Sequence, residues 1–98
     1  MSEPVLAPAD VDAALAEQGI AWERQDDQLT TTVTLRDFAG ALAFVNEVGA
    51  AAEAANHHPD IDIRWNKVHL VLTTHDAGGL TVLDLALATA IDRLRPLR

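Results

Sequence analysis

The spacing of apolar residues changes its period along this chain of 98 residues, and that change limits the folds it can adopt. Residues 20–35 and 61–73 alternate apolar and polar side chains, which is the period of a half-buried strand. The segments before, between and after them repeat apolar residues every three or four positions, as amphipathic helices do. The sequence therefore predicts the element order helix, two strands, helix, two strands, helix.

Start and stop signals support the three helices. The first is expected over residues 8–18, and the longest over residues 37–56. Pro59 is expected to end the long helix, because proline disfavours helical backbone in the residue before it. Thr81 and Asp84 have the spacing of a capping box at the start of the last helix. The apolar stripe of that helix consists of Leu83, Ala86, Leu87, Ala90 and Leu94.

Two hairpins supply the strands. In the first, Asp26-Asp27 is the turn before the alternating run from Leu29 to Leu35, and in the second, Asn66-Lys67 joins residues 61–65 to residues 68–73. Together they predict an α+β fold, a four-stranded antiparallel sheet with three helices packed on one face. The other face of the sheet, and its free edges, would stay open and favour self-association.

Composition narrows the possible functions. Fifteen Asp and Glu against seven Lys and Arg give a formal charge of −8, which repels nucleic acids and anionic lipid surfaces. No run of apolar residues is long enough for a membrane span, and the absence of cysteine excludes disulfides and thiolate metal sites. The N-terminus lacks the basic and apolar regions of a signal peptide. We therefore expect residues 1–98 to form one domain located in the cytoplasm.

All four histidines lie between residues 57 and 75. His57 and His58 follow the long helix, and His75 follows the last strand, which antiparallel pairing brings back toward the start of the third strand. Three histidines can therefore converge. His69 is excluded, because the six residues that separate it from His75 span about 20 Å of extended strand. Glu53, four residues before His57, is expected to contact that ring at i,i+4 spacing.

Other interpretations of the cluster are possible. His57 and His58 could be helix-end residues that only contact the terminal carbonyls. A metal site that adds Asp60, Asp62 or Glu53 is chemically feasible, although adjacent histidines seldom aim at one ion and no HExxH spacing exists. The sequence also lacks a GxSxG elbow, a glycine-rich phosphate loop and a cysteine nucleophile. Proton transfer by histidine then remains, because imidazole has both protonation states available near neutral pH.

One motif extends over four of the predicted elements. Its parts are Glu53-x3-His57-His58-Pro59, Trp65-Asn66-Lys67-Val68-His69, Thr73-Thr74-His75-Asp76, and Gly79-Leu80-Thr81 followed by Asp84. With these residues, the chain from about Arg36 to Leu94 resembles the pterin-4a-carbinolamine dehydratase family, and Trp22 matches a tryptophan in the first strand of that family. The resemblance implies the same sheet with three helices on one side.

The resemblance also implies an activity. Members dehydrate 4a-hydroxytetrahydrobiopterin, the carbinolamine that aromatic amino acid hydroxylases release, to quinonoid dihydropterin, in tetrahydrobiopterin recycling. They use no metal and no cofactor, and they form homodimers or homotetramers. Members of the family also act as non-catalytic dimerisation partners of a transcription factor, which is the alternative function.

The residues that the resemblance assigns fall into two groups. The catalytic group contains His57, His58, His75 and Glu53. The substrate-binding group contains Asn56, Pro59, Thr73, Thr74, Asp76 and Trp22, and in it Asn56 stands where many relatives have aspartate.

Overall fold

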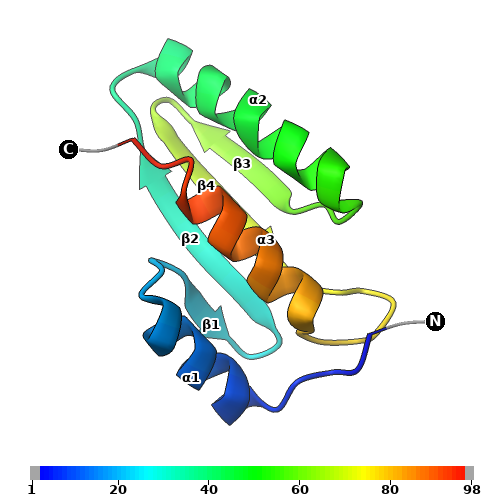
Figure 1. Cartoon of the computed structure of the whole chain (residues 1–98). Coiled ribbons are helices and arrows are strands. Elements are labelled where there is room, and N and C mark those ends of the chain that lie inside the picture. Colours follow the sequence, from blue (N-terminus) through cyan, green and yellow to red (C-terminus); the bar gives the residue numbers. More distant parts are fainter. Residues whose placement is uncertain (1–2, 97–98) are drawn as a thin grey trace.

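The computed structural model describes residues 3–96 of the chain, which fold into three helices and four strands. The helices and strands, in chain order, are α1 (Pro8–Gln18), β1 (Glu23–Gln25), β2 (Gln28–Thr34), α2 (Phe38–Ala55), β3 (Asp60–Arg64), β4 (Lys67–Leu72) and α3 (Val82–Asp92). Figure 1 shows α3 crossing the middle of the sheet, with α1 beside β1 and α2 along the side that carries β3. The predicted α+β fold and its element order are confirmed.

The sheet is antiparallel throughout and has the order β1-β2-β4-β3. Strand β4 therefore lies in the interior, where Val71 pairs with Thr30 on one side and with Asp60 on the other. In the turn of the first hairpin Asp26 has a φ of 55°, as two-residue hairpin loops require. In the second hairpin the positive φ falls on Trp65, so the turn is one residue earlier than predicted and Lys67 opens β4.

Three element ends differ from the sequence prediction. Trp22 precedes β1, which has three residues only. Helix α2 ends because Asn56 adopts the left-handed conformation, and Pro59 comes three residues later, after the helix has already ended. Leu94 lies beyond the end of α3. The capping box at Thr81 is present as predicted.

The core lies between the sheet and the helices. Its fully buried large side chains are Val11, Leu29, Val48, Val68, Leu70, Leu72, Leu87 and Ile91. On the opposite face of the sheet, Thr32, Thr34, Lys67 and His69 are exposed. Within residues 3–96 no helix is long and apolar enough to cross a membrane.

Candidate active site

A cavity of about 290 Å³ lies where α2 ends, β4 ends and α3 begins. The residues that line it are Asn56, His57, His58, Thr73, Thr74, His75, Asp76 and Leu83. The structure thus brings together three histidines that are up to 18 positions apart in the sequence, as the antiparallel pairing predicts. His69 does not line the cavity. It lies on the open face of the sheet, with Nδ1 2.9 Å from the hydroxyl of Thr32.

The end of α2 directs the two adjacent histidines out of the helix. Asn56 has φ 50° and ψ 42°, a left-handed conformation that asparagine adopts more readily than most residues. Its backbone N–H and that of His57 both bond to the carbonyl of Ala52, which satisfies the last turn of the helix. His57 and His58 therefore leave the helix axis and cross toward the end of β4.

The loop after β4 supplies the other wall. The β3–β4 register pairs Asp60 with Val71, so the residues that follow β4 lie beside those that precede β3. A compact turn then returns the chain, because the N–H of Thr74 bonds to the carbonyl of Gly79 and Gly78 has a φ of 78°. His75 is exposed at the rim of the cavity.

His57 is bonded to a buried carboxylate that the sequence analysis placed only in the helix cap. Its Nε2 lies 2.6 Å from Oδ1 of Asp84, and the Asp84 side chain is completely buried. The second oxygen, Oδ2, accepts the hydroxyl of Thr74 at 2.7 Å and the N–H of Thr81 at 2.9 Å. Asp84 therefore caps α3 and holds a cavity histidine with the same carboxylate.

Glu53 pairs with His58, and the predicted contact with His57 is wrong. Oε2 of Glu53 lies 2.5 Å from Nε2 of His58, and both side chains are exposed. The i,i+4 spacing assumes that the helix continues to position 57, but the left-handed Asn56 ends it one residue earlier. Because the chain turns at Asn56, the histidine that returns to Glu53 is His58, five residues after it.

The two tryptophans and Pro59 lie outside the cavity lining. Trp22 is a core residue with 4% of its surface exposed. Trp65 is exposed at the far end of the β3–β4 hairpin, where its ring stacks on Phe38 with centroids 6.5 Å apart.

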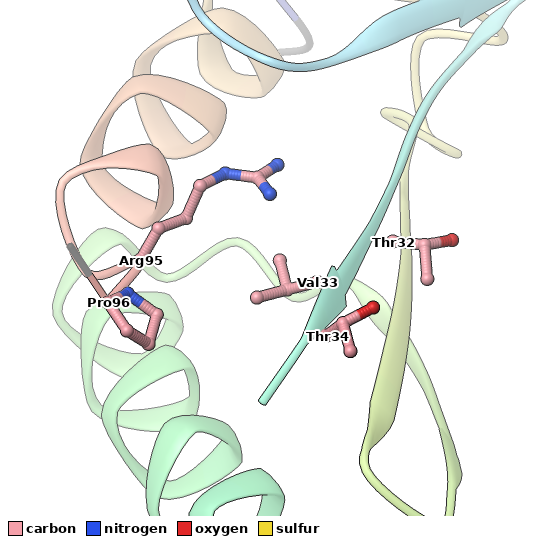
Figure 2. Close-up of a pocket in the computed structure, with 5 residues that line it drawn as sticks. All are labelled: Thr32, Val33, Thr34, Arg95 and Pro96. Carbon is pink, nitrogen blue, oxygen red and sulfur yellow. The ribbon is translucent and has the colours of Figure 1, made fainter. Parts of the chain in front are cut away.

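A second hollow, of about 280 Å³, lies at the edge of β2 and has no histidine in its lining. Figure 2 shows the Arg95 side chain extending toward β2 from beyond the end of α3, with Val33 on its side of the strand and Thr32 and Thr34 on the other. None of the sequence-predicted site residues lines it. Among residues 3–96, no three His, Asp or Glu side chains are arranged to hold a metal ion.

The cavity is equipped for proton transfer. Nε2 of His57 and Nε2 of His58 are each hydrogen-bonded to a carboxylate. Nδ1 of each ring is not engaged by that carboxylate. Within residues 3–96, His75 has no bonded carboxylate, so the three rings are not equivalent. A site of this kind can give a proton to one atom of a bound molecule and take one from another.

Comparisons with known proteins agree on one family. The family model described as pterin 4 alpha carbinolamine dehydratase matches residues 4–94. A protein of Chloroflexus aurantiacus, provisionally named pterin-4-alpha-carbinolamine dehydratase, is 50% identical over 91 residues, which cover 93% of this chain and 97% of that protein. One of Thermomicrobium roseum with the same provisional name is 52% identical over 82 residues, 84% of this chain and 88% of its own.

A solved structure agrees with the fold. The crystal structure of a transcriptional coactivator/pterin dehydratase from Brucella melitensis superposes with a TM-score of 0.86 and 25% identity, over 94% of this chain and 99% of that chain. This agrees with the family model and with the relatives at about half identity. The chain belongs to the pterin 4 alpha carbinolamine dehydratase family, a family of hydro-lyases.

Proposed function

We propose that this chain removes water from the carbinolamine 4a-hydroxytetrahydropterin and forms quinonoid dihydropterin by histidine acid and base catalysis. Family membership supports the class of activity. One observation supports the catalytic part of the proposal. His57, His58 and His75 converge on one cavity, and carboxylates are bonded to the first two.

The chemistry asks for one acid and one base. The bond from C4a to the hydroxyl oxygen breaks, the hydroxyl takes a proton and leaves as water, and the proton on N5 passes to a base while the C4a–N5 double bond forms. One proton is given and one is taken, so charge balances without a further reactant. We assign the acid to His57 or His75 and the base to His58 or its neighbour.

The size and lining of the cavity support a small planar ring as its ligand. Its volume of about 290 Å³ is near the lower end of ligand pockets, which range from about 300 to 1,000 Å³. Asn56, Thr73, Thr74 and Asp76 line it beside the histidines, and their polar groups are proposed to bind the edge of the pterin. The hydroxyls of Thr73 and Thr74 already donate to the carbonyl of Asp27 and to Asp84, and the backbone N–H and carbonyl of Thr74 bond within its own turn, so we propose the side chains of Asn56 and Asp76 as the groups that bind the ring edge.

The histidines are tested by substitution. His57→Ala and His75→Ala should each reduce the rate of carbinolamine dehydration by about 10²–10⁴-fold, which is the usual contribution of one acid or base group. Stopped-flow absorbance on freshly generated carbinolamine measures the rate. His69→Ala is the matched control, because this ring lies on the open face of the sheet and its loss should leave the rate unchanged. Unchanged rates in both cavity variants would refute the assignment.

The proposal also includes the physiological substrate, the location and the oligomeric state of the chain. The substrate is 4a-hydroxytetrahydrobiopterin released by an aromatic amino acid hydroxylase, and the chain acts in the cytoplasm as a homodimer or homotetramer. Exposed apolar side chains of Phe38, Leu42 and Trp65 support self-association, since large apolar groups in one region favour a partner surface. Light scattering should give a mass of two or four chains, and a monomer would contradict this part.

A non-catalytic binding module is the alternative. The Brucella melitensis neighbour is titled both transcriptional coactivator and pterin dehydratase, so the two roles share this fold. Titration with 7,8-dihydrobiopterin separates them, because an enzyme of this chemistry should bind the pterin and shift the NMR signals of His57, His58 and His75. Absence of binding at high pterin concentration would favour the module.

A further inference from the structure

We propose that Asp84 is a positioning residue, which fixes the ring of His57 so that Nδ1 is the nitrogen that exchanges a proton with the substrate. This inference rests on the proposed function, because it names the reacting atom of one residue of the same site. Asp84 itself does not line the cavity and has no exposed surface, so it can act only through the ring that it holds.

The hydrogen bond between the two side chains defines the tautomer. An ionised carboxylate can only accept hydrogen bonds, so Nε2 of His57 is the donor across the 2.6 Å contact with Oδ1. A neutral imidazole carries one N–H, and with that proton on Nε2 the lone pair is on Nδ1. In its protonated form the ring would donate from Nδ1. In either direction the proton moves through the same atom.

Further hydrogen bonds hold the carboxylate in place. The hydroxyl of Thr74 donates its only proton to Oδ2, so the 2.8 Å contact between Thr74 and Thr81 must use the proton of Thr81. The backbone N–H of Thr81 donates to the same Oδ2. All three side chains are buried, and a rotation of the carboxylate would leave buried donors without a partner.

The second pair in the cavity lacks this support. Glu53 and His58 are 78% and 55% exposed, so water can replace either partner and the side chains are free to change rotamer. We therefore expect the tautomer of His57 to be fixed by the protein, and that of His58 to depend far less on its carboxylate. The contrast gives the experiment an internal comparison.

Asp84→Asn is the direct test. The amide oxygen can keep the bonds to Thr74 and Thr81, and the amide nitrogen then faces Nε2 of His57, which must become an acceptor. The neutral ring would carry its proton on Nδ1, the wrong nitrogen for the substrate. The same exchange in serine proteases leaves the geometry intact and lowers kcat by about 10⁴-fold. Here we expect a loss of about 10²–10⁴-fold in kcat with little change in KM.

The tautomer can be measured without substrate. Long-range ¹H–¹⁵N NMR of the full chain labelled in histidine, at a pH where the ring is neutral, should show His57 protonated on Nε2 in the wild type and on Nδ1 in Asp84→Asn. Asp37→Asn is the matched control, since Asp37 caps α2 by accepting the N–H of Gly40 at 2.8 Å and does not line the cavity. That control should keep both the tautomer and kcat.

Two results would overturn the inference, namely a wild-type His57 protonated on Nδ1, or an Asp84→Asn variant with unchanged tautomer and kcat. If Asp84→Asn fails to fold, Thr74→Val and Thr74→Ser replace it. The valine removes one donor to Oδ2 and should populate the second tautomer of His57, whereas the serine keeps the donor and should keep the wild-type tautomer, both read by the same NMR measurement without substrate. Equal behaviour of the two Thr74 variants would also overturn it. An inactive wild-type chain would refute the dehydratase proposal, while the tautomer would still report whether Asp84 orients His57.

Discussion

At the scale of single residues, Asn56 determines how the histidines leave α2. It is one of three residues other than glycine with a positive φ, among those that the structure describes, and its carbonyl side leads directly into His57. The helical pattern of the sequence predicts the helix itself but contains little information about the backbone rotation at its last residue. This is why the sequence predicts a contact from Glu53 to His57, while the folded chain makes it to His58.

The backbone at Asn56 makes a testable prediction. Asn56→Val should lower the free energy of unfolding by about 1–2 kcal/mol, because a side chain branched at Cβ is strained in the left-handed region. Urea denaturation followed by circular dichroism measures the change. Asn56→Gly is the control, and it should cost only a few tenths of a kcal/mol because glycine tolerates this φ. Equal stability of the two variants would contradict the backbone explanation.

Asp84 shows which part of the site can be predicted from residue patterns. Its spacing from Thr81 is a local signal, and the capping box that it predicts is present. The cap uses Oδ2 of the carboxylate. The other oxygen, Oδ1, bonds to His57, which lies 27 positions earlier in the chain. That second contact depends on how α3 packs beside the end of β4, which no local spacing encodes.

At the scale of elements, side chains replace part of the ladder between β1 and β2. The carbonyl of Ala21 accepts the hydroxyl of Thr31 at 2.7 Å and Nη2 of Arg95 at 2.9 Å, and its N–H donates to Asp92. Regular pairing therefore starts only at Glu23. The alternation of Ile20 and Trp22 predicts a longer strand, because it records which side chains are buried and not which groups satisfy the backbone.

Helix α1 is tied to β1 by an ion pair that should make stability depend on pH. Nε and Nη2 of Arg24 donate to the two oxygens of Asp12 at 2.8 and 3.1 Å, and the hydrogen bond lowers the pKa of Asp12 below its usual value of 3.8. A carboxyl group with a lowered folded-state pKa stabilises the fold above its unfolded-state pKa, and loses that contribution as pH falls through the folded-state value.

The pH dependence can be measured by thermal unfolding between pH 6 and pH 2. The wild type should lose more stability than Asp12→Asn over this range, because the variant has no carboxylate to protonate. Asp10→Asn removes the same charge from the same helix without touching Arg24, and its pH profile should stay parallel to that of the wild type. Parallel profiles for Asp12→Asn and the wild type would show that the pair contributes nothing.

At the scale of the whole molecule, the two faces of the sheet have different roles. Leu70 is fully buried under the helices, and its neighbour Val71 points to the open face. Leu70→Ala should cost about 2–5 kcal/mol of unfolding free energy, the usual range for a leucine removed from a packed core. Val71→Ala should cost about 1 kcal/mol or less. Denaturant titration compares them, and a similar cost at both positions would mean that an assembly buries the open face.

The interior position of β4 has a consequence for motion in the site. Residues 67–71 pair on both sides, whereas β1 and β3 each pair on one side only. Amide hydrogens of β4 should therefore exchange with solvent only in the rarest openings, and those of β1 by local fraying. Since β4 leads directly into Thr73, Thr74 and His75, one wall of the cavity extends from an interior strand of the sheet. Within this wall, movement is therefore expected first in residues 75–78, which lie between the paired residues Thr74 and Gly79.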